Sequence, residues 1–88
     1  MKMKNDIYLD ELIAEAKREF VQQVFAVMGE KDINQSELAR ACNMKPQQIT
    51  MHLHHVHNSS LYTMCRIAGV LGYRVRISLE RIEQEAGE

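Results

Sequence analysis

Apolar residues recur at helical spacing along the first third of the chain. They fall every three or four positions, at Leu9, Ile13, Ala16, Phe20, Val24 and Met28. A stripe with this period predicts a long amphipathic helix over residues 6–29. Asp6 or Asp10 could cap its start, and Gly29 fits its C-terminal stop. The pattern leaves open whether this is one helix or two helices with a bend near Lys17.

Two shorter helical patterns follow between residues 34 and 53. Asn34 fits the N-cap of the first, and Glu37 three residues later completes the pattern of a capping box. Asn43 tolerates a left-handed backbone, which a tight turn between the helices requires. Pro46 fits the first turn of the second helix, where its missing N–H is not needed. The segment therefore predicts a helix-turn-helix.

A fourth helix is predicted over residues 60–72, with Ser59 or Ser60 as its N-cap. Its expected buried stripe is Leu61, Met64, Cys65, Ala68 and Leu71. After Gly72 the period changes to two, which predicts a strand over 73–79 with one buried face. A charged tail over 80–88 follows, either a helical turn or without structure.

The predicted strand has no second strand in the chain to pair with. Its backbone N–H and C=O groups would therefore remain unpaired. The simplest partner is the same strand of a second copy, paired antiparallel about a two-fold axis. The dimerisation residues would then be Tyr73, Val75, Ile77 and Leu79. Two alternatives stay open: a solvated edge segment resting on the fourth helix, and pairing with a strand of another protein.

Bulk composition fits one small globular domain. The chain has 88 residues, of which 26% are charged and 45% apolar. No apolar stretch is long enough to span a membrane, and the N-terminal lysines precede no apolar segment typical of a secretory signal. Cys42 and Cys65 both fall in apolar helical patterns, so we expect two buried thiols in a reducing cytoplasm.

Charge is unevenly distributed although the net charge is only −1. Residues 34–79 hold five basic residues and one acidic residue, or +4, and the rest holds six basic and eleven acidic, or −5. This distribution favours a basic face that contacts phosphate, with acidic ends turned away. Chance clustering is the alternative.

Residues 35–79 resemble the phage-repressor-like helix-turn-helix family, of the Cro/C1 or XRE type. The resemblance is carried by Q-S-E-L-A-R-A-C-N-M at 35–44, P-Q-Q-I-T at 46–50 and L-Y-T-M-C-R-I-A-G-V-L-G-Y at 61–73. The segment R-V-R-I-S-L at 74–79 is similar to the C-terminal strand of antitoxin-like members, those of the HigA kind. The resemblance implies a mainly α, lambda-repressor-like bundle of four to five helices with a C-terminal β-strand.

Carried over by position, the resemblance assigns roles within residues 35–53. Gln35 would touch a phosphate, Ala39 would be the small residue where the two helices cross, and Ile49 would be buried. The base-facing residues would be Gln47, Gln48 and Met51. The chain departs from the family where Asn43 replaces a turn glycine, where His52 and Leu53 exchange apolar and polar character, and where His54-His55 replaces a later glycine.

Side-chain chemistry supports the same interface. A glutamine amide offers a donor and an acceptor that match adenine N6 and N7 in the major groove. Thr50 or Met51 could touch a thymine methyl group, and Lys45 could contact phosphate. The predicted DNA-binding residues are Gln35, Lys45, Pro46, Gln47, Gln48, Thr50, Met51, His54 and His55. Ordinary exposed helix polarity is the alternative reading of the two glutamines.

The histidine-rich stretch lacks the pattern of a metal site. His52, His54, His55 and His57 have no cysteine or carboxylate nearby at ligand spacing, so we expect no metal and no cofactor. A polar loop facing DNA is favoured, and a metal site or a response to pH stays open. No nucleophile elbow or glycine-rich phosphate loop is present, so we expect no enzyme activity.

These patterns together predict a cytoplasmic, sequence-specific DNA-binding regulator. As a homodimer it would bind an inverted repeat of double-stranded DNA, with half-sites about 34 Å apart, and act as a repressor. It could also be the antitoxin of a toxin–antitoxin pair, whose acidic N-terminal helix or strand binds a basic toxin. The alternative from a different class is a protein-interaction module with this fold that does not bind DNA.

Overall fold

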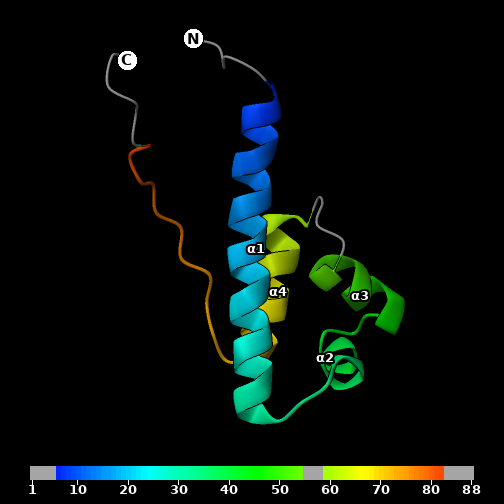
Figure 1. The fold of residues 1–88 in the computed structure, drawn as a ribbon. Helices are drawn as coiled ribbons and strands as arrows, with labels where there is room; N and C mark the ends of the chain where they lie inside the picture. Colours follow the sequence, from blue (N-terminus) through cyan, green and yellow to red (C-terminus); the bar gives the residue numbers. More distant parts are fainter. Residues whose placement is uncertain (1–5, 55–58, 83–88) are drawn as a thin grey trace, which may run out of the picture.

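The computed structural model describes residues 6–54 and 59–82, and this part of the chain is mainly helical (Figure 1). Its elements are α1 (Asp6–Lys31), α2 (Gln35–Ala41), α3 (Pro46–His54) and α4 (Leu61–Val70). The prediction of a mainly α fold is confirmed. None of these helices is both long and apolar enough to cross a membrane.

Three of the helices end in the same way. A residue one or two positions after each helix has a left-handed backbone, with φ of 57° at Asp32, 58° at Asn43 and 90° at Gly72. Each end also carries the paired hydrogen bonds of a Schellman motif, such as Met44 N to Ala39 O at 2.8 Å after α2. The turn predicted at Asn43 is confirmed. The predicted stop of α1 at Gly29 is wrong, because α1 continues to Lys31 and Asp32 supplies the left-handed residue.

Side-chain caps begin two of the helices. At α2 the backbone N–H of Glu37 donates to Asn34 Oδ1 at 2.8 Å, and the N–H of Asn34 donates to Glu37 Oε1 at 2.9 Å. This is the predicted capping box, and it satisfies two N–H groups that have no partner within the helix. At α4 the cap is Ser60, whose Oγ accepts from the N–H of Thr63 at 3.1 Å.

The core lies where α2, α3 and α4 pack against the C-terminal half of α1. Ile49 and Ile67 are fully buried, and Leu38 and Ala39 are each 1% exposed. The whole buried cluster comprises Val24, Met28, Leu38, Ala39, Cys42, Ile49, Leu53, Ile67 and Leu71. The predicted burial of Ala39 and Ile49 is confirmed.

The N-terminal half of α1 projects beyond this core. Leu9 and Ile13 are 39% and 48% exposed, whereas Val24 and Met28 on the same predicted stripe are buried. The molecule is elongated, with principal extents of 50 × 22 × 19 Å. The predicted stripe is therefore a core face only in its C-terminal half, because α1 has 26 residues and the longest helix that packs against it, α4, has 10.

Helix α4 faces the core with a different set of residues from the one predicted. Ile67, Ala68 and Leu71 are buried, Met64 is partly buried, and Leu61 and Cys65 are exposed. The prediction that both cysteines are buried is correct for Cys42 and wrong for Cys65. Helix α4 is rotated about its axis so that Ile67 lies at the centre of its contact with the core. The helical spacing of apolar residues alone does not predict this rotation.

The predicted strand over 73–79 is not formed among the described residues. The segment 73–82 is extended and runs back beside α1, on the side of α1 opposite to α3 (Figure 1). A strand needs a neighbouring strand for its hydrogen bonds, and the described chain supplies none. Val75 is partly buried, while Tyr73, Ile77 and Leu79 are exposed. Residues 83–88 of the predicted charged tail lie outside the described residues.

Candidate nucleic-acid interface

Helix α3 has one buried side and one open side. Ile49 and Leu53 face the core, while Lys45, Pro46, Gln47, Gln48 and Met51 are exposed. Met51 is 55% exposed, which is unusual for a large apolar side chain on a helix anchored in the core. All five exposed residues belong to the set to which the sequence assigned DNA contacts; Gln35 and Thr50 of that set are only partly exposed. Their exposure meets a requirement of DNA contact, and the contact itself stays a prediction.

The two glutamines of α3 differ in their surroundings. Gln48 Oε1 accepts a hydrogen bond from the backbone N–H of Lys45 at 2.9 Å, so this side chain caps the first turn of its own helix. The side chain of Gln47 makes no hydrogen bond with any described residue. Gln47 therefore keeps both its donor and its acceptor for a ligand, whereas Gln48 already uses one of its acceptor positions.

Thr50 is also engaged with its own helix. Its Oγ1 donates to the carbonyl oxygen of Pro46 at 3.0 Å, and the side chain is only partly exposed. The hydroxyl proton of Thr50 is therefore donated within the helix and not to a ligand, as is common for threonine inside helices. Its methyl group remains the part of Thr50 that could touch a thymine.

Gln35 of α2 and His54 of α3 are joined by a hydrogen bond between their side chains. Gln35 Nε2 donates to His54 Nε2 at 2.9 Å, which joins the start of α2 to the end of α3. The His54 ring also lies against Phe25 of α1, with ring centroids 5.5 Å apart. Neither contact was predicted from the sequence. Both residues support the position of α3, and a phosphate contact by either would compete with their mutual hydrogen bond.

The histidine-rich stretch is only partly described, since His55 and His57 lie outside the described residues. His52 Nδ1 is 2.7 Å from the hydroxyl oxygen of Ser59, which joins the C-terminal part of α3 to the segment before α4. No group of three or more histidine, cysteine or acidic side chains within residues 6–54 and 59–82 could hold a metal ion.

Lys17 is a buried cation that sequence analysis missed. It is 8% exposed, and its Nζ is buried without a hydrogen-bond partner among the described residues. Burial lowers the pKa of the Lys17 ammonium. Burial, and then the positive charge of Lys17, lower the pKa of His52. A sequence signal existed, because Lys17 lies one helical turn before Phe20 and Val21 on the side that enters the core.

Replacing Lys17 with methionine is expected to raise the free energy of unfolding by about 1–2 kcal/mol. The change removes an unpartnered buried ammonium and keeps an unbranched side chain of similar length. Urea denaturation followed by circular dichroism at neutral pH measures the gain. The matched control is Arg18→Met, at an exposed neighbouring position, which should change stability by less than about 0.5 kcal/mol. A loss of stability in Lys17→Met would show that the ammonium has a stabilising partner.

The His52 site predicts that acid destabilises the protein. In the unfolded chain His52 titrates near about 6.5, and its folded pKa is lower. The contribution of neutral His52 to the free energy of unfolding is therefore complete above pH about 6.5, and it is lost as the pH falls through the pKa of His52 in the folded protein. Thermal unfolding across pH 5 to 8 measures this, and His52→Gln should show a shallower decline than the unchanged protein. Equal slopes for the two proteins would contradict the assignment.

Arg66 is used inside the fold. Its guanidinium donates to the carbonyl oxygen of Cys42 at the end of α2 and lies over the ring of Tyr62, 5.7 Å from the centroid. Burial raises the pKa of the Cys42 thiol, and Arg66 partly offsets that rise. Arg66 thus stabilises the packing of α4 against α2.

The predicted basic face is smaller than the sequence suggested. Arg66 is bound to the backbone, and Arg74 and Arg76 lie on the C-terminal segment, across α1 from α3 (Figure 1). Within α2, α3 and the turn between them, the exposed lysine and arginine side chains are Arg40 and Lys45. The backbone N–H groups at the start of α3 add a further positive end for phosphate.

Comparison of the chain with protein-family models, with curated proteins and with solved structures finds no match.

Proposed function

We propose that the chain is a sequence-specific DNA-binding regulator of the lambda-repressor-like helix-turn-helix kind. One observation supports this most strongly. The turn at Asn43 fixes α3 so that Ile49 is buried while Gln47 and Met51 stand on its open side. Helix α3 is anchored in the core through Ile49, and the side-chain amide of Gln47 on its exposed side has no hydrogen-bond partner among the described residues. This arrangement suits insertion of α3 into the major groove.

Within this proposal the contacts divide by chemistry. Gln47 reads a base, preferably adenine, and Met51 offers an apolar contact to a thymine methyl group. Lys45 and the backbone N–H groups at the N-terminus of α3 contact phosphate at the same end of the helix, with Pro46 shaping the first turn. Gln48 keeps its capping bond and donates from its amide nitrogen. Gln35 and His54 act by holding α3 in place.

The proposed active form is a cytoplasmic homodimer on an inverted repeat, and it represses by covering a promoter. Dimerisation uses the C-terminal segment, in which Val75, Ile77 and Leu79 alternate with polar residues. The backbone of residues 74–82 makes no hydrogen bond with any described residue, so both of its edges are open to a second strand.

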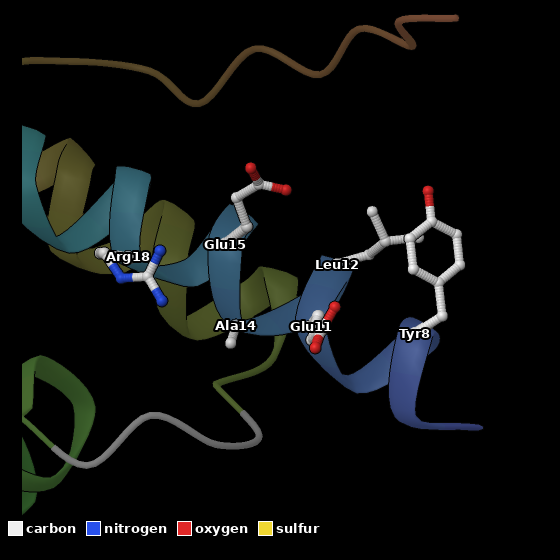
Figure 2. A pocket seen from close by; sticks show the side chains of 6 residues that line it. All are labelled: Tyr8, Glu11, Leu12, Ala14, Glu15 and Arg18. Atoms are coloured by element: carbon white, nitrogen blue, oxygen red, sulfur yellow. The ribbon is translucent and has the colours of Figure 1, made fainter. Parts of the chain in front are cut away.

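The exposed half of α1 supports the antitoxin form of this proposal. A surface hollow of about 500 Å³ lies there, lined by Tyr8, Glu11, Leu12, Ala14, Glu15 and Arg18 (Figure 2). Apolar residues and carboxylates are interleaved on this half, which suits a partner with apolar and basic side chains. A toxin of basic charge is the proposed partner at this surface.

Selection of binding sites from a random DNA pool tests the proposal. The expected product is an inverted repeat, and binding to it should weaken steeply as salt rises, because each phosphate contact releases a counterion. A chain that enriches no sequence, or whose binding does not depend on salt, contradicts DNA binding.

A protein-interaction module is the second candidate, and one feature favours it. Among the described residues of the helix-turn-helix segment 34–54, Arg40 and Lys45 are the exposed lysine and arginine side chains, which is few for a phosphate-binding surface. In that case α1 and the C-terminal segment would be the functional surfaces, and no promoter fragment would shift at low salt. The same selection experiment therefore separates the two candidates.

A further inference from the structure

One hydrogen bond at the end of α3 depends on the protonation state of a histidine. Gln35 Nε2 lies 2.9 Å from His54 Nε2. An amide nitrogen only donates, so His54 Nε2 is the acceptor and the proton of the neutral ring is on Nδ1. A protonated His54 carries protons on both ring nitrogens and offers no acceptor. Protonation of His54 therefore breaks this hydrogen bond.

Turning over the Gln35 amide restores the contact in the opposite direction. Gln35 Oε1 then takes the place of Nε2 and accepts from the protonated Nε2 of His54. A hydrogen bond from a charged donor is stronger than one between neutral groups. The same turn moves the NH2 group of Gln35 away from His54, so both of its N–H donors become free. Gln35 is partly exposed and lies outside the core cluster, so the turn requires no repacking of the core.

The position of His54 suits a positive charge. His54 is exposed and ends α3, and the unpaired carbonyl groups of a helix C-terminus favour cations. The ring of Phe25 lies against the imidazole, with the two centroids 5.5 Å apart, and this contact does not depend on which ring nitrogens carry protons. The contact with α1 is therefore kept while the charge of His54 changes.

No described charge on the neighbouring helices is paired with His54. Within four residues of Phe25, Gln35 and His54, the described titratable side chains are Lys31, Asp32, Glu37 and His52. Glu37 accepts from the backbone N–H of Asn34, and His52 is joined to Ser59 and subject to the charge of Lys17. None of these groups forms an ion pair or a hydrogen bond with His54 in the part of the chain that the structure describes.

We infer that a proton on His54 turns this pair into a phosphate-binding site, so that DNA binding strengthens as the pH falls. The protonated ring adds a cation to the segment 34–54, where Arg40 and Lys45 are the exposed lysine and arginine side chains. His54 Nδ1 and the freed Gln35 amide then offer N–H donors of the kind that phosphate oxygens accept. By linkage, the DNA complex holds this proton more tightly than the free protein does. The inference rests on the DNA binding of the proposed function and names a regulation of that interface.

Mobility-shift titration of the selected duplex tests the inference at pH about 5.5 and about 7.5, on either side of the range in which histidine ordinarily titrates. The protein is expected to bind about five- to tenfold more tightly at the lower pH. The slope of log affinity against log salt should also steepen by about 0.9, because one more phosphate contact releases one more counterion. Circular dichroism at both pH values checks that the protein is folded.

Two variants assign the effect to one histidine. His54→Gln keeps a side-chain amide that can bond to Gln35 and does not titrate, so it should lose both the gain in acid and the steeper salt slope. His52→Gln is the matched control on the same helix and should keep both. An equal loss in the two variants overturns the inference.

The imidazole nitrogen signals of His54 give a readout that needs no DNA. In the neutral ring, nuclear magnetic resonance is expected to show the proton on Nδ1 and none on Nε2. A neutral ring that carries its proton on Nε2 overturns the inference, because the bond to Gln35 would then already run in the other direction.

The outcomes separate this inference from the proposed function. Absence of any duplex shift at either pH overturns DNA binding and this inference with it. DNA binding whose pH dependence and salt slope are the same in His54→Gln and in the unchanged protein overturns the inference alone. Binding that tightens in acid through His54, with the steeper salt slope, supports both.

Discussion

Replacing Ile49 with alanine is expected to lower the free energy of unfolding by about 2–5 kcal/mol. Ile49 is fully buried and belongs to the cluster that joins α3 to the other three helices. Removing the three outer carbon atoms of Ile49 leaves a cavity in the core. A helix of nine residues, anchored at both ends, can shift only slightly to fill it. Because domains of this size are stable by about 5–15 kcal/mol, the loss is a large part of the total. Urea denaturation followed by circular dichroism measures it.

The control for this prediction lies two residues further along the same helix. Met51→Ala removes a side chain that is 55% exposed, so stability should change by less than about 0.5 kcal/mol. Similar losses in the two variants would mean that α3 does not pack through Ile49, and the orientation of its open side would then be wrong.

Replacing Gln47 with alanine is expected to reduce discrimination at one base pair of the selected DNA site by about 1–3 kcal/mol. The loss arises because Gln47 is exposed and keeps both its donor and its acceptor free of described partners. Competition between the selected site and single-base variants in a mobility-shift assay measures it. Stability should change little, since the side chain is outside the core.

Gln22→Ala is the matched control for Gln47→Ala, because Gln22 is an exposed glutamine of α1 far along the chain from α3. It should bind DNA with unchanged base preference. An unchanged preference in Gln47→Ala would remove Gln47 from the reading residues. If Gln48→Ala alone relaxed the preference, reading would belong to Gln48 despite its capping bond to Lys45.

Features set by neighbours in sequence were predictable. The capping box at Asn34, the left-handed turn at Asn43 and the start of α3 at Pro46 each depend on side chains within three or four residues. Local chemistry also explains the one local error, since Asp32 adopts the left-handed backbone that the sequence analysis assigned to Gly29. Aspartate is among the few residues other than glycine that enter this region readily.

Features set by distant contacts were not predictable. The stripe on α1 shows which side is apolar, but it does not show that only the part from Lys17 onward meets other helices. The exposure of Cys65 depends in the same way on the rotation of α4 about its axis. The C-terminal segment has the alternation of a strand, but residues 6–54 and 59–82 supply no neighbouring strand for it.

The candidate interface was predicted in outline and changed in detail. The open side of α3 could be predicted because Ile49 fixes which side is buried. The bond between Gln35 and His54 could not be predicted, because nineteen residues separate them and only the packing of α2 against α3 brings them together. The basic residues of 34–79 were close in sequence but are divided between two sides of α1 (Figure 1).

The most direct test of DNA reading by α3 is a nuclear magnetic resonance titration of the labelled protein with the duplex obtained by selection. The largest changes in backbone amide signals are expected at Lys45, Gln47 and Met51, with smaller changes at the start of α2. Residues 8–15 of α1, on the projecting half, should be unaffected. Changes confined to α1 or to the C-terminal segment, with α3 unchanged, would contradict the account.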